Sequence, residues 1–397
     1  MKLNKKKEET KMKFGRYKGK RYAGKEIKKE KDKEIEKYKI SEEIPKALAE
    51  DYKPKQKKKS KGKKILKISI IVLVILLILI IVSVGVFIAL KLGKINYKDL
   101  DESDLAINDN LYSEVEGLTQ SEYDKVTNIL FLGSDSRDMD DAYAGSGDAN
   151  IIISINPKFK SIKLISIPRD TAVYIDDTNK RYKISVAFNV GQEQLTVKTI
   201  NKTFDLNLKE YVTVNISEMY NIINELGGLE LDITKDEMKY INEYIDMFYG
   251  YSGRPVQKVT TYGKVTLTGE QVAAHVKERM AGSSDKSETH GDYGRTKRQR
   301  EVLQALLNKI ASRDAGEISR ISDLILEQVT TNVDTGKIAS LLLEFILNKD
   351  AYMKNVTSVM LPGLDYSDET IENNAYIYVT NDIERAKKEF IHYMYEI

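Results

Sequence analysis

The chain of 397 residues contains no cysteine and only three histidines, His275, His290 and His392. Without cysteine it forms no disulfide bond and offers no thiolate as a nucleophile or metal ligand. So few histidines argue against a metal site built from several imidazole groups. A metal ion would then be held by carboxylates, whose oxygens favour Mg²⁺ or Mn²⁺.

Positive charge is in short supply after the first 67 residues, although the whole chain has a formal net charge of +3. Residues 1–67 hold 27 lysines and arginines against 11 aspartates and glutamates, whereas the remaining 330 residues hold 36 against 49. Such asymmetry indicates that the two parts lie in different surroundings. The lysine-rich and glutamate-rich composition of residues 1–67, with few apolar residues, predicts a basic and largely disordered arm.

One long run lacks charge altogether, because residues 68–90 are 23 uncharged and mostly apolar residues. At about 1.5 Å per residue this run spans the roughly 30 Å hydrocarbon core of a bilayer, so we expect one uncleaved transmembrane anchor helix. Seven lysines crowd residues 57–67 just before it. The positive-inside rule then places residues 1–67 in the cytoplasm and residues 91–397 outside the cell, in a single-pass protein of the cell membrane.

The lysine cluster at residues 57–67 has two interpretations. Nucleic-acid binding is one of them, but the position beside a membrane helix favours anionic lipid, or simply the setting of orientation. We therefore expect a membrane partner and no nucleic acid. Residues 91–127, which follow the apolar run, are polar and acidic and are interpreted as a linker or accessory segment.

Apolar runs then alternate with helical patterns. The β-branched runs at residues 150–156 and 161–167 predict two strands joined by a turn at residues 157–160. Further strands are predicted at residues 128–133, 209–215, 229–234, 357–361 and 376–379. Helical patterns are predicted after a candidate cap at Ser217, after a Thr268 and Gln271 capping box, from Asp292 onwards, and over residues 383–395. This mixture predicts one α/β or α+β domain.

Arginine is rare beside lysine, 13 against 50, so its placement is informative. A planar, forked and permanently charged donor suits phosphate oxygens better than lysine does. Six of the eleven arginines beyond the apolar run lie in four short stretches, some with an aspartate nearby. The stretches and the separate loop GSGDAN contribute Asp135 and Arg137, Asp148, Arg169 and Asp170, Arg279, and Asp292, Arg295, Arg298, Gln299 and Arg300.

Each of these stretches alone is more often explained by turn residues and solvated surface groups than by a function. Asp292 is a plausible helix N-cap with Arg295, Arg298 and Gln299 on one stripe, and a helix N-terminus flanked by arginines suits an anion. Together the stretches supply carboxylates for a hard cation and arginines for phosphate oxygens. That combination indicates phosphoryl transfer or diphosphate binding.

The motifs resemble the LytR-CpsA-Psr family of bacterial membrane-anchored cell-envelope proteins. The resemblance runs from about Asn128 to Leu307 and on towards the end of the chain. It is carried by NILFLGSDSR, NPKFKSIKLISIPRDT, YVTVNISEMYNIINELGGLELDI, LTGEQVAAHVKERM and DYGRTKRQREVL. It implies one extracytoplasmic α/β domain over residues 128–397, with a mixed central β-sheet flanked by helices.

The resemblance also implies a phosphotransferase. Such a protein moves a glycopolymer, such as teichoic acid or a capsular or secondary wall polysaccharide, from undecaprenyl diphosphate to peptidoglycan. The acceptor is the 6-hydroxyl of N-acetylmuramic acid, so a phosphoanhydride is broken and a phosphodiester is made. Two alternatives remain open, a non-catalytic envelope protein that binds lipid-linked glycan or has a regulatory role, and a polyprenyl pyrophosphate hydrolase.

Residue roles follow from matching these motifs. The resemblance implies that Asp135 and Asp148 hold Mg²⁺ or Mn²⁺. It implies catalytic roles for Asp135, Arg169, Arg279 and Arg295. It implies contacts to the diphosphate or lipid from Arg137, Asp170, Lys277, Asp292, Arg298 and Gln299. A hydrophobic tunnel for the polyprenyl tail is expected near Val212, Ile222 and Leu226.

The chain departs from the family pattern at several positions. Lys277 stands where the family usually has an arginine, and lysine keeps the charge but loses the bidentate fork. Ser185 and Gln192 replace a usual asparagine and a usual second glycine, and no arginine precedes Asp148. These departures predict a narrower or altered substrate range, or weaker activity.

Overall fold

The computed structural model describes residues 95–134, 147–176, 178–250, 255–280 and 291–395. The basic arm, the apolar run at residues 68–90, and the candidate site residues Asp135 and Arg137 lie outside the described residues. Within those ranges, no helix has the length and apolar character needed to cross a membrane.

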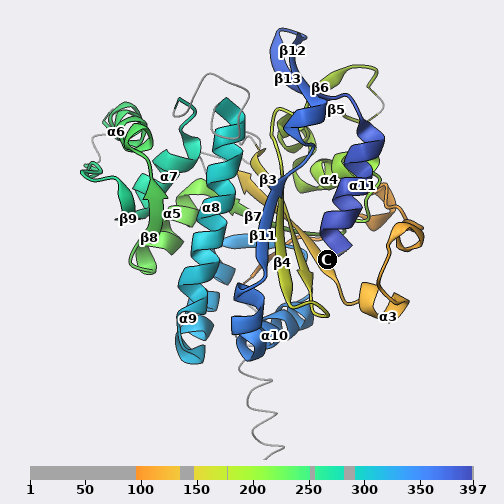
Figure 1. The fold of residues 1–397 in the computed structure, drawn as a ribbon, viewed down its shortest axis with the longest axis horizontal. Coiled ribbons are helices and arrows are strands. Elements are labelled where there is room, and N and C mark those ends of the chain that lie inside the picture. Colours follow the sequence, from red (N-terminus) through yellow and green to blue (C-terminus); the bar gives the residue numbers. More distant parts are fainter. Residues whose placement is uncertain (1–94, 135–146, 177, 251–254, 281–290, 396–397) are drawn as a thin grey trace, which may run out of the picture. The chain divides into compact units, whose positions relative to one another are not determined.

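A mixed seven-stranded sheet forms the centre of the fold (Figure 1), as the resemblance implies. Its strands, in spatial order, are β1 (Asn96–Tyr97), β10 (Val329–Thr331), β7 (Glu210–Asn215), β2 (Thr127–Ser134), β3 (Gly147–Asn156), β4 (Ser161–Ile167) and β11 (Val356–Met360). The pairs β1–β10, β2–β7 and β4–β11 are parallel, and the other neighbours are antiparallel. The predicted β3–β4 hairpin is confirmed.

Helices cover both faces of this sheet because successive side chains of a strand point to opposite faces. On β3, Ile152 packs into the core beneath α4 (Ser185–Phe204) and α11 (Ile383–Tyr395). Its neighbour Ile151 packs on the other face, towards α8 (Gly291–Ala311) and α10 (Thr335–Met353). Figure 1 shows these two pairs of helices on opposite sides of the strands. The buried β-branched strands therefore have both faces covered.

A second hydrophobic cluster lies beside α8. It is formed by α5 (Ile216–Glu225), β8 (Leu229–Ile233), α6 (Lys235–Tyr249), β9 (Gly263–Leu267) and α7 (Gly269–Lys277). The helix α9 (Ala315–Glu327) packs through Ile321 against Ile222 and Leu226 of α5 and its C-cap. Two further hairpins pair β5 (Ala172–Tyr174) with β6 (Arg181–Lys183) and β12 (Ser367–Glu372) with β13 (Ala375–Thr380).

The segment before β2 packs as part of the domain. Besides β1, it contains the short helices η3 (Glu102–Asp104), η4 (Leu111–Glu114) and α3 (Gln120–Tyr123), and a further short helix, η5 (Leu364–Tyr366), follows β11. Leu105 and Leu111 are fully buried in the main core. The described part of residues 91–127 is therefore packed into the core of the domain and is not only a linker.

Local signals in the sequence account for several helix ends. The predicted capping box is confirmed, because the Thr268 amide donates to Oε1 of Gln271 at 2.9 Å and the Gln271 amide donates to Oγ1 of Thr268 at 3.4 Å. Ser217 as the cap of α5 is wrong. The cap is Asn215, whose Oδ1 accepts from the Ser217 amide at 3.0 Å. Asp292 is likewise one position inside α8, which begins at Gly291, so it is not the N-cap.

Candidate active site

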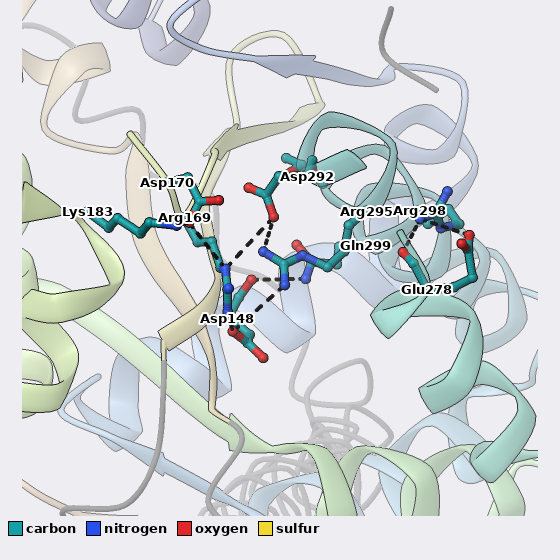
Figure 2. A network of polar contacts seen from close by, with 10 residues as sticks. Asp148, Arg169, Asp170, Lys183, Glu278, Asp292, Arg295, Arg298 and Gln299 are labelled. Atoms are coloured by element: carbon teal, nitrogen blue, oxygen red, sulfur yellow. Dashed lines mark hydrogen bonds and ion pairs between the residues drawn. The ribbon is translucent and has the colours of Figure 1, made fainter. Parts of the chain in front are cut away.

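Three segments of the chain meet at one edge of the central sheet (Figure 2). The β3–β4 ladder ends with Asn150 opposite Ile167. Asp148 lies two residues before Asn150 and Arg169 two residues after Ile167, so the ladder brings both side chains to the same edge. The first turns of α8 then add Asp292, Arg295 and Gln299.

Ion pairs join these segments into one network. Arg169 Nη1 contacts Asp148 Oδ1, and Arg295 Nη2 contacts Asp292 Oδ1. The second set of pairs is longer, at 3.9 Å from Arg295 Nη1 to Asp148 Oδ1, 3.9 Å from Arg169 Nε to Asp292 Oδ1, and 3.5 Å from Arg169 Nε to Asp170 Oδ1. Lys183, from β6, contacts Asp170 Oδ1 at 2.8 Å. Each arginine thus bridges at least two carboxylates.

The network is graded in depth. The side chains of Asp292 and Arg295 are each 3% exposed, whereas those of Asp148 and Arg169 are 19% and 18% exposed. The outer pair therefore faces a ligand first, and the inner pair supports it from below. Nε of Arg169 and Nε of Arg295 are buried without a hydrogen-bond partner, as is Oδ2 of Asp292. Unsatisfied buried donors carry a desolvation cost, which an anionic ligand would offset.

Burial and charge act against each other on these carboxylates. Burial alone would raise the pKa of Asp148, but Arg295 and Arg169 outweigh it, so its pKa lies below the ordinary value and the group stays ionised. Burial dominates at Asp292 and raises its pKa despite Arg295. Burial would lower the pKa of Arg169, but the surrounding aspartates raise it.

Two cavities meet at this network. The first has mostly apolar walls from the sheet, α5, α7 and α8, including Phe131, Val214, Met219, Val276 and Val302. The second is a more polar cleft beside α6 that includes Arg169, Lys277 and Arg279. Asp148, Lys277 and Arg295 line both cavities. An apolar chamber thus opens directly onto a charged cleft.

The apolar walls are not those expected from the sequence. Ile222 and Leu226 do not line the cavity, because they face α9 and pack against Ile321. Val212 is also absent from its walls, and its neighbour on the same face of β7, Val214, takes that place. The cavity side of α5 is instead Ile216 and Met219.

Arg298 lies away from the network, at the end of α7 (Figure 2). Its Nε donates to the His275 carbonyl at 3.0 Å, and its Nη2 contacts the Glu278 carbonyl and lies 3.2 Å from Glu278 Oε2. At 100° per residue, Arg298 lies about 60° around the helix from Arg295, which is enough to turn it to α7. Arg298 therefore holds the segment that carries Lys277 and Arg279, and the interpretation that it contacts diphosphate has no support in its geometry.

Three residues that the sequence did not single out, Tyr293, Tyr378 and Lys183, also adjoin the network. Gln299, which was singled out, donates from Nε2 to the Asp148 carbonyl at 3.0 Å and so fixes the start of β3. Tyr293, directly after Asp292, stacks on Tyr378 with ring centroids 4.3 Å apart. Lys183 holds Asp170 in place. Tyr293 belongs to the quoted motif DYGRTKRQ, which was the available signal, whereas no local pattern marks Lys183 or Tyr378.

The fold and the site define an α/β protein in which an arginine and aspartate cluster adjoins an apolar cavity. A model of the LytR_cpsA_psr family matches residues 94–391, and the chain belongs to this family. The resemblance seen in the sequence is thereby confirmed.

Named relatives agree with this assignment. The chain is 32% identical over 280 residues to the polyisoprenyl-teichoic acid–peptidoglycan teichoic acid transferase TagU of Oceanobacillus iheyensis, covering 68% of this chain and 76% of that protein. It is 30% identical over 230 residues to TagV of Bacillus subtilis, which bears the same transferase name, covering 57% of this chain and 52% of that protein. The crystal structure of B. subtilis TagV has the same fold, with a TM-score of 0.53 and 24% identity over 69% of this chain and 98% of that one.

Proposed function

We propose that this protein is a phosphotransferase that moves an anionic glycopolymer, such as teichoic acid or a capsular or secondary wall polysaccharide, from undecaprenyl diphosphate to the 6-hydroxyl of N-acetylmuramic acid in peptidoglycan. One observation carries the proposal. The apolar cavity and the charged cleft share Asp148, Lys277 and Arg295. A lipid diphosphate has the same two-part character, because an apolar chain ends in a doubly phosphorylated head.

The reaction requires the protein mainly to position the reactants and to stabilise the developing charge. The acceptor oxygen attacks the phosphorus that carries the glycan, the bond from that phosphorus to the bridging oxygen breaks, and polyprenyl phosphate leaves. Negative charge grows on the leaving phosphate, so fixed guanidinium donors stabilise the transition state more than the ground state. Arg169 and Arg295 supply such donors. The proton of the acceptor hydroxyl passes to water in the cleft or to an ionised carboxylate that lines it, such as Asp148.

A divalent cation, Mg²⁺ or Mn²⁺, is part of the proposal. Asp148 fits one ligand position, since it is ionised and faces both cavities. Ser134 and Gly147, which precede Asp135 and Asp148 in the sequence, are paired across β2 and β3. Among the described residues no group of three or more His, Asp or Glu side chains is placed to hold a metal. The ion would therefore need oxygens of the diphosphate as well, and it would neutralise part of their charge.

The proposed location rests on the sequence alone. We propose that residues 68–90 anchor the chain in the cell membrane, with residues 1–67 in the cytoplasm and the described domain outside. A protease added to intact protoplasts should remove the outer domain and leave the arm intact. Digestion of the arm with survival of the domain would reverse this orientation.

The direct test is to incubate the full chain with a lipid-diphosphate glycan, Mg²⁺ and peptidoglycan fragments. A covalent glycan–peptidoglycan product detected by mass spectrometry is the expected result. Release of glycan phosphate without a covalent product would make the protein a pyrophosphate hydrolase. Tight lipid binding with neither product would make it a non-catalytic binding or regulatory protein.

A further inference from the structure

The β12–β13 ribbon carries a face that changes from buried to exposed along its length. Residues 376 and 378 of β13 point to the same face because side chains alternate along a strand. The ladder places Ile371 opposite Tyr376 and Glu369 opposite Tyr378. Tyr378 is 8% exposed, whereas Tyr376 is 66% and Ile371 is 60% exposed. An exposed tyrosine and isoleucine therefore form a cross-strand pair next to a buried tyrosine.

The buried end of this face is joined to the candidate active site. The Tyr378 amide donates to the Asp170 carbonyl at 2.8 Å, and Tyr378 forms a β-bridge with Thr171. The Tyr378 ring stacks on Tyr293, at an interplanar angle of 20°, and Tyr293 directly follows Asp292. The ribbon thus contacts both segments that carry site carboxylates. Along the strand, Tyr376 lies about 7 Å further out than Tyr378.

The exposed end is fixed rather than free. Arg181 of β6 forms an ion pair with Glu372, with Nε 3.1 Å from Oε2, and Asn373 Nδ2 donates to the Arg181 carbonyl at 3.1 Å. Near the base of the ribbon, Asn381 Nδ2 donates to Asp368 Oδ2 at 2.7 Å. Figure 1 shows β12 and β13 beside β5 and β6, projecting beyond the central sheet. A surface held in this way loses little conformational entropy when a ligand docks.

Charge distinguishes the two sides of the site. The ribbon carries Asp368, Glu369 and Glu372, whereas the cleft beside α6 has more cations than carboxylates, namely Arg169, Lys277, Arg279 and Arg295 against Asp148, Glu243 and Glu278. A polyanionic donor polymer is therefore favoured on the α6 side and disfavoured along the ribbon. An uncharged sugar chain has no such penalty at the ribbon. Sugar rings present apolar C–H faces, which suit a rigid tyrosine with a hydroxyl at its tip.

We propose that the Tyr376 and Ile371 face is the acceptor platform, where the N-acetylated hexosamine chain of peptidoglycan docks beside the sugar whose hydroxyl enters the site. The proposal rests on the proposed function for the identity of the acceptor. It gives the ribbon a positioning and binding role. Tyr378 and Tyr293 then connect the platform to Asp292, so that a sugar chain lying on Tyr376 runs towards the network.

The test measures transfer by the full chain at saturating lipid donor, with the concentration of peptidoglycan oligosaccharide varied. We expect Tyr376→Ala to raise KM for the oligosaccharide about 10-fold, the effect of losing one aromatic stacking contact. Neither kcat nor the slow hydrolysis of donor without acceptor should change. Tyr376→Phe should keep most of the affinity. Tyr262→Ala is the matched control, since Tyr262 is 59% exposed and lies just before β9.

An NMR titration that measures the affinity for the oligosaccharide in the absence of donor separates this inference from the proposed function. Weaker binding by Tyr376→Ala alone supports the platform even if the wild-type chain transfers nothing, in which case only the proposed function fails. Wild-type KM and wild-type oligosaccharide binding in Tyr376→Ala overturn the platform and leave the proposed function intact. An equal loss in Tyr262→Ala, or a changed oligomeric state in Tyr376→Ala, also overturns it.

Discussion

Replacing Arg169 by alanine should damage turnover far more than folding. Every carboxylate that Arg169 contacts keeps another cation in the variant. Asp148 and Asp292 keep Arg295, and Asp170 keeps Lys183 at 2.8 Å. The free energy of unfolding should therefore fall by less than about 3 kcal/mol, the lower end of the cost of leaving a buried charge without a partner.

The expected kinetic effect is larger. Removal of one preorganised donor that stabilises developing charge typically lowers kcat by about 10²- to 10³-fold, or about 2.7–4 kcal/mol of transition-state stabilisation. Arg169→Lys should recover only part of the rate, because lysine cannot contact Asp148 and a phosphate through a planar fork. The assay is the initial rate of glycan transfer at saturating lipid substrate, with lipid binding and thermal unfolding measured in parallel.

Arg313→Ala is the control for this experiment, because Arg313 lies beyond the network and pairs only loosely with Glu317, at 3.7 Å. It should leave the rate near that of the wild type. If Arg169→Ala weakens lipid binding but leaves turnover unchanged, the arginines only hold the carrier. The catalytic assignment would then be wrong, and a binding function would be favoured.

Three further outcomes are expected. Asp148→Asn should abolish the dependence of the rate on Mg²⁺ concentration while the domain stays folded, and an unchanged Mg²⁺ dependence would remove Asp148 from the metal site. Arg298→Ala should cost about 3–5 kcal/mol in urea denaturation, more than Arg169→Ala, because it removes the guanidinium that lies 3.2 Å from the buried Glu278 carboxylate, and an equal or smaller cost would contradict its assignment to α7. Burial lowers the pKa of His275 to about 4, so the unfolded chain binds a proton that the folded chain does not between about pH 6.5 and 4. The free energy of unfolding should therefore fall by about 3 kcal/mol as the pH drops through this window, and His275→Gln should remove that contribution. If the free energy of unfolding of the wild type and of His275→Gln depends on pH equally, the imidazole is protonated in the fold.

Local sequence patterns predicted the parts of the fold that local physics determines. The strand at residues 161–167 and the helix at residues 383–395 have the predicted bounds. A β-branched run and an amphipathic stripe can each be read from one continuous stretch of sequence. The two-residue β1 is different, since it exists only by pairing with β10, more than 200 residues away. No window of sequence contains both partners.

The helix α4 was not predicted because its pattern is interrupted. Gly191 and Gln192 have non-helical backbone angles inside it, and Gln192 has a φ of 52°. That left-handed conformation is one which glycine adopts at no cost, and this explains why a second glycine suits the position. Ser185, another departure from the family pattern, begins the helix, and its amide donates to the Arg169 carbonyl at 3.2 Å. Both departures thus lie in the element that adjoins the site.

The candidate site was predictable where strand register decides it. Asp148 lies at the start of β3 and Arg169 lies just after the end of its neighbour β4, and Arg295 occupies the first turns of a helix whose N-terminus reaches the same edge. Arg298 was assigned to the same stripe from its spacing of three residues. A spacing of three residues on a helix sets two side chains about 60° apart, and only the position of α7 shows that this offset turns Arg298 away from the network.

The central claim is that the apolar cavity and the arginine network form one site for a lipid diphosphate. Met219→Trp tests it most directly, because Met219 lines the apolar cavity and is not part of the ion-pair network. Calorimetry should show that this variant loses at least 10-fold in affinity for a polyprenyl diphosphate while binding inorganic pyrophosphate as the wild type does. Leu343→Trp, at a 58% exposed position on α10, should change neither affinity. Wild-type affinity of Met219→Trp for the polyprenyl diphosphate would contradict the claim.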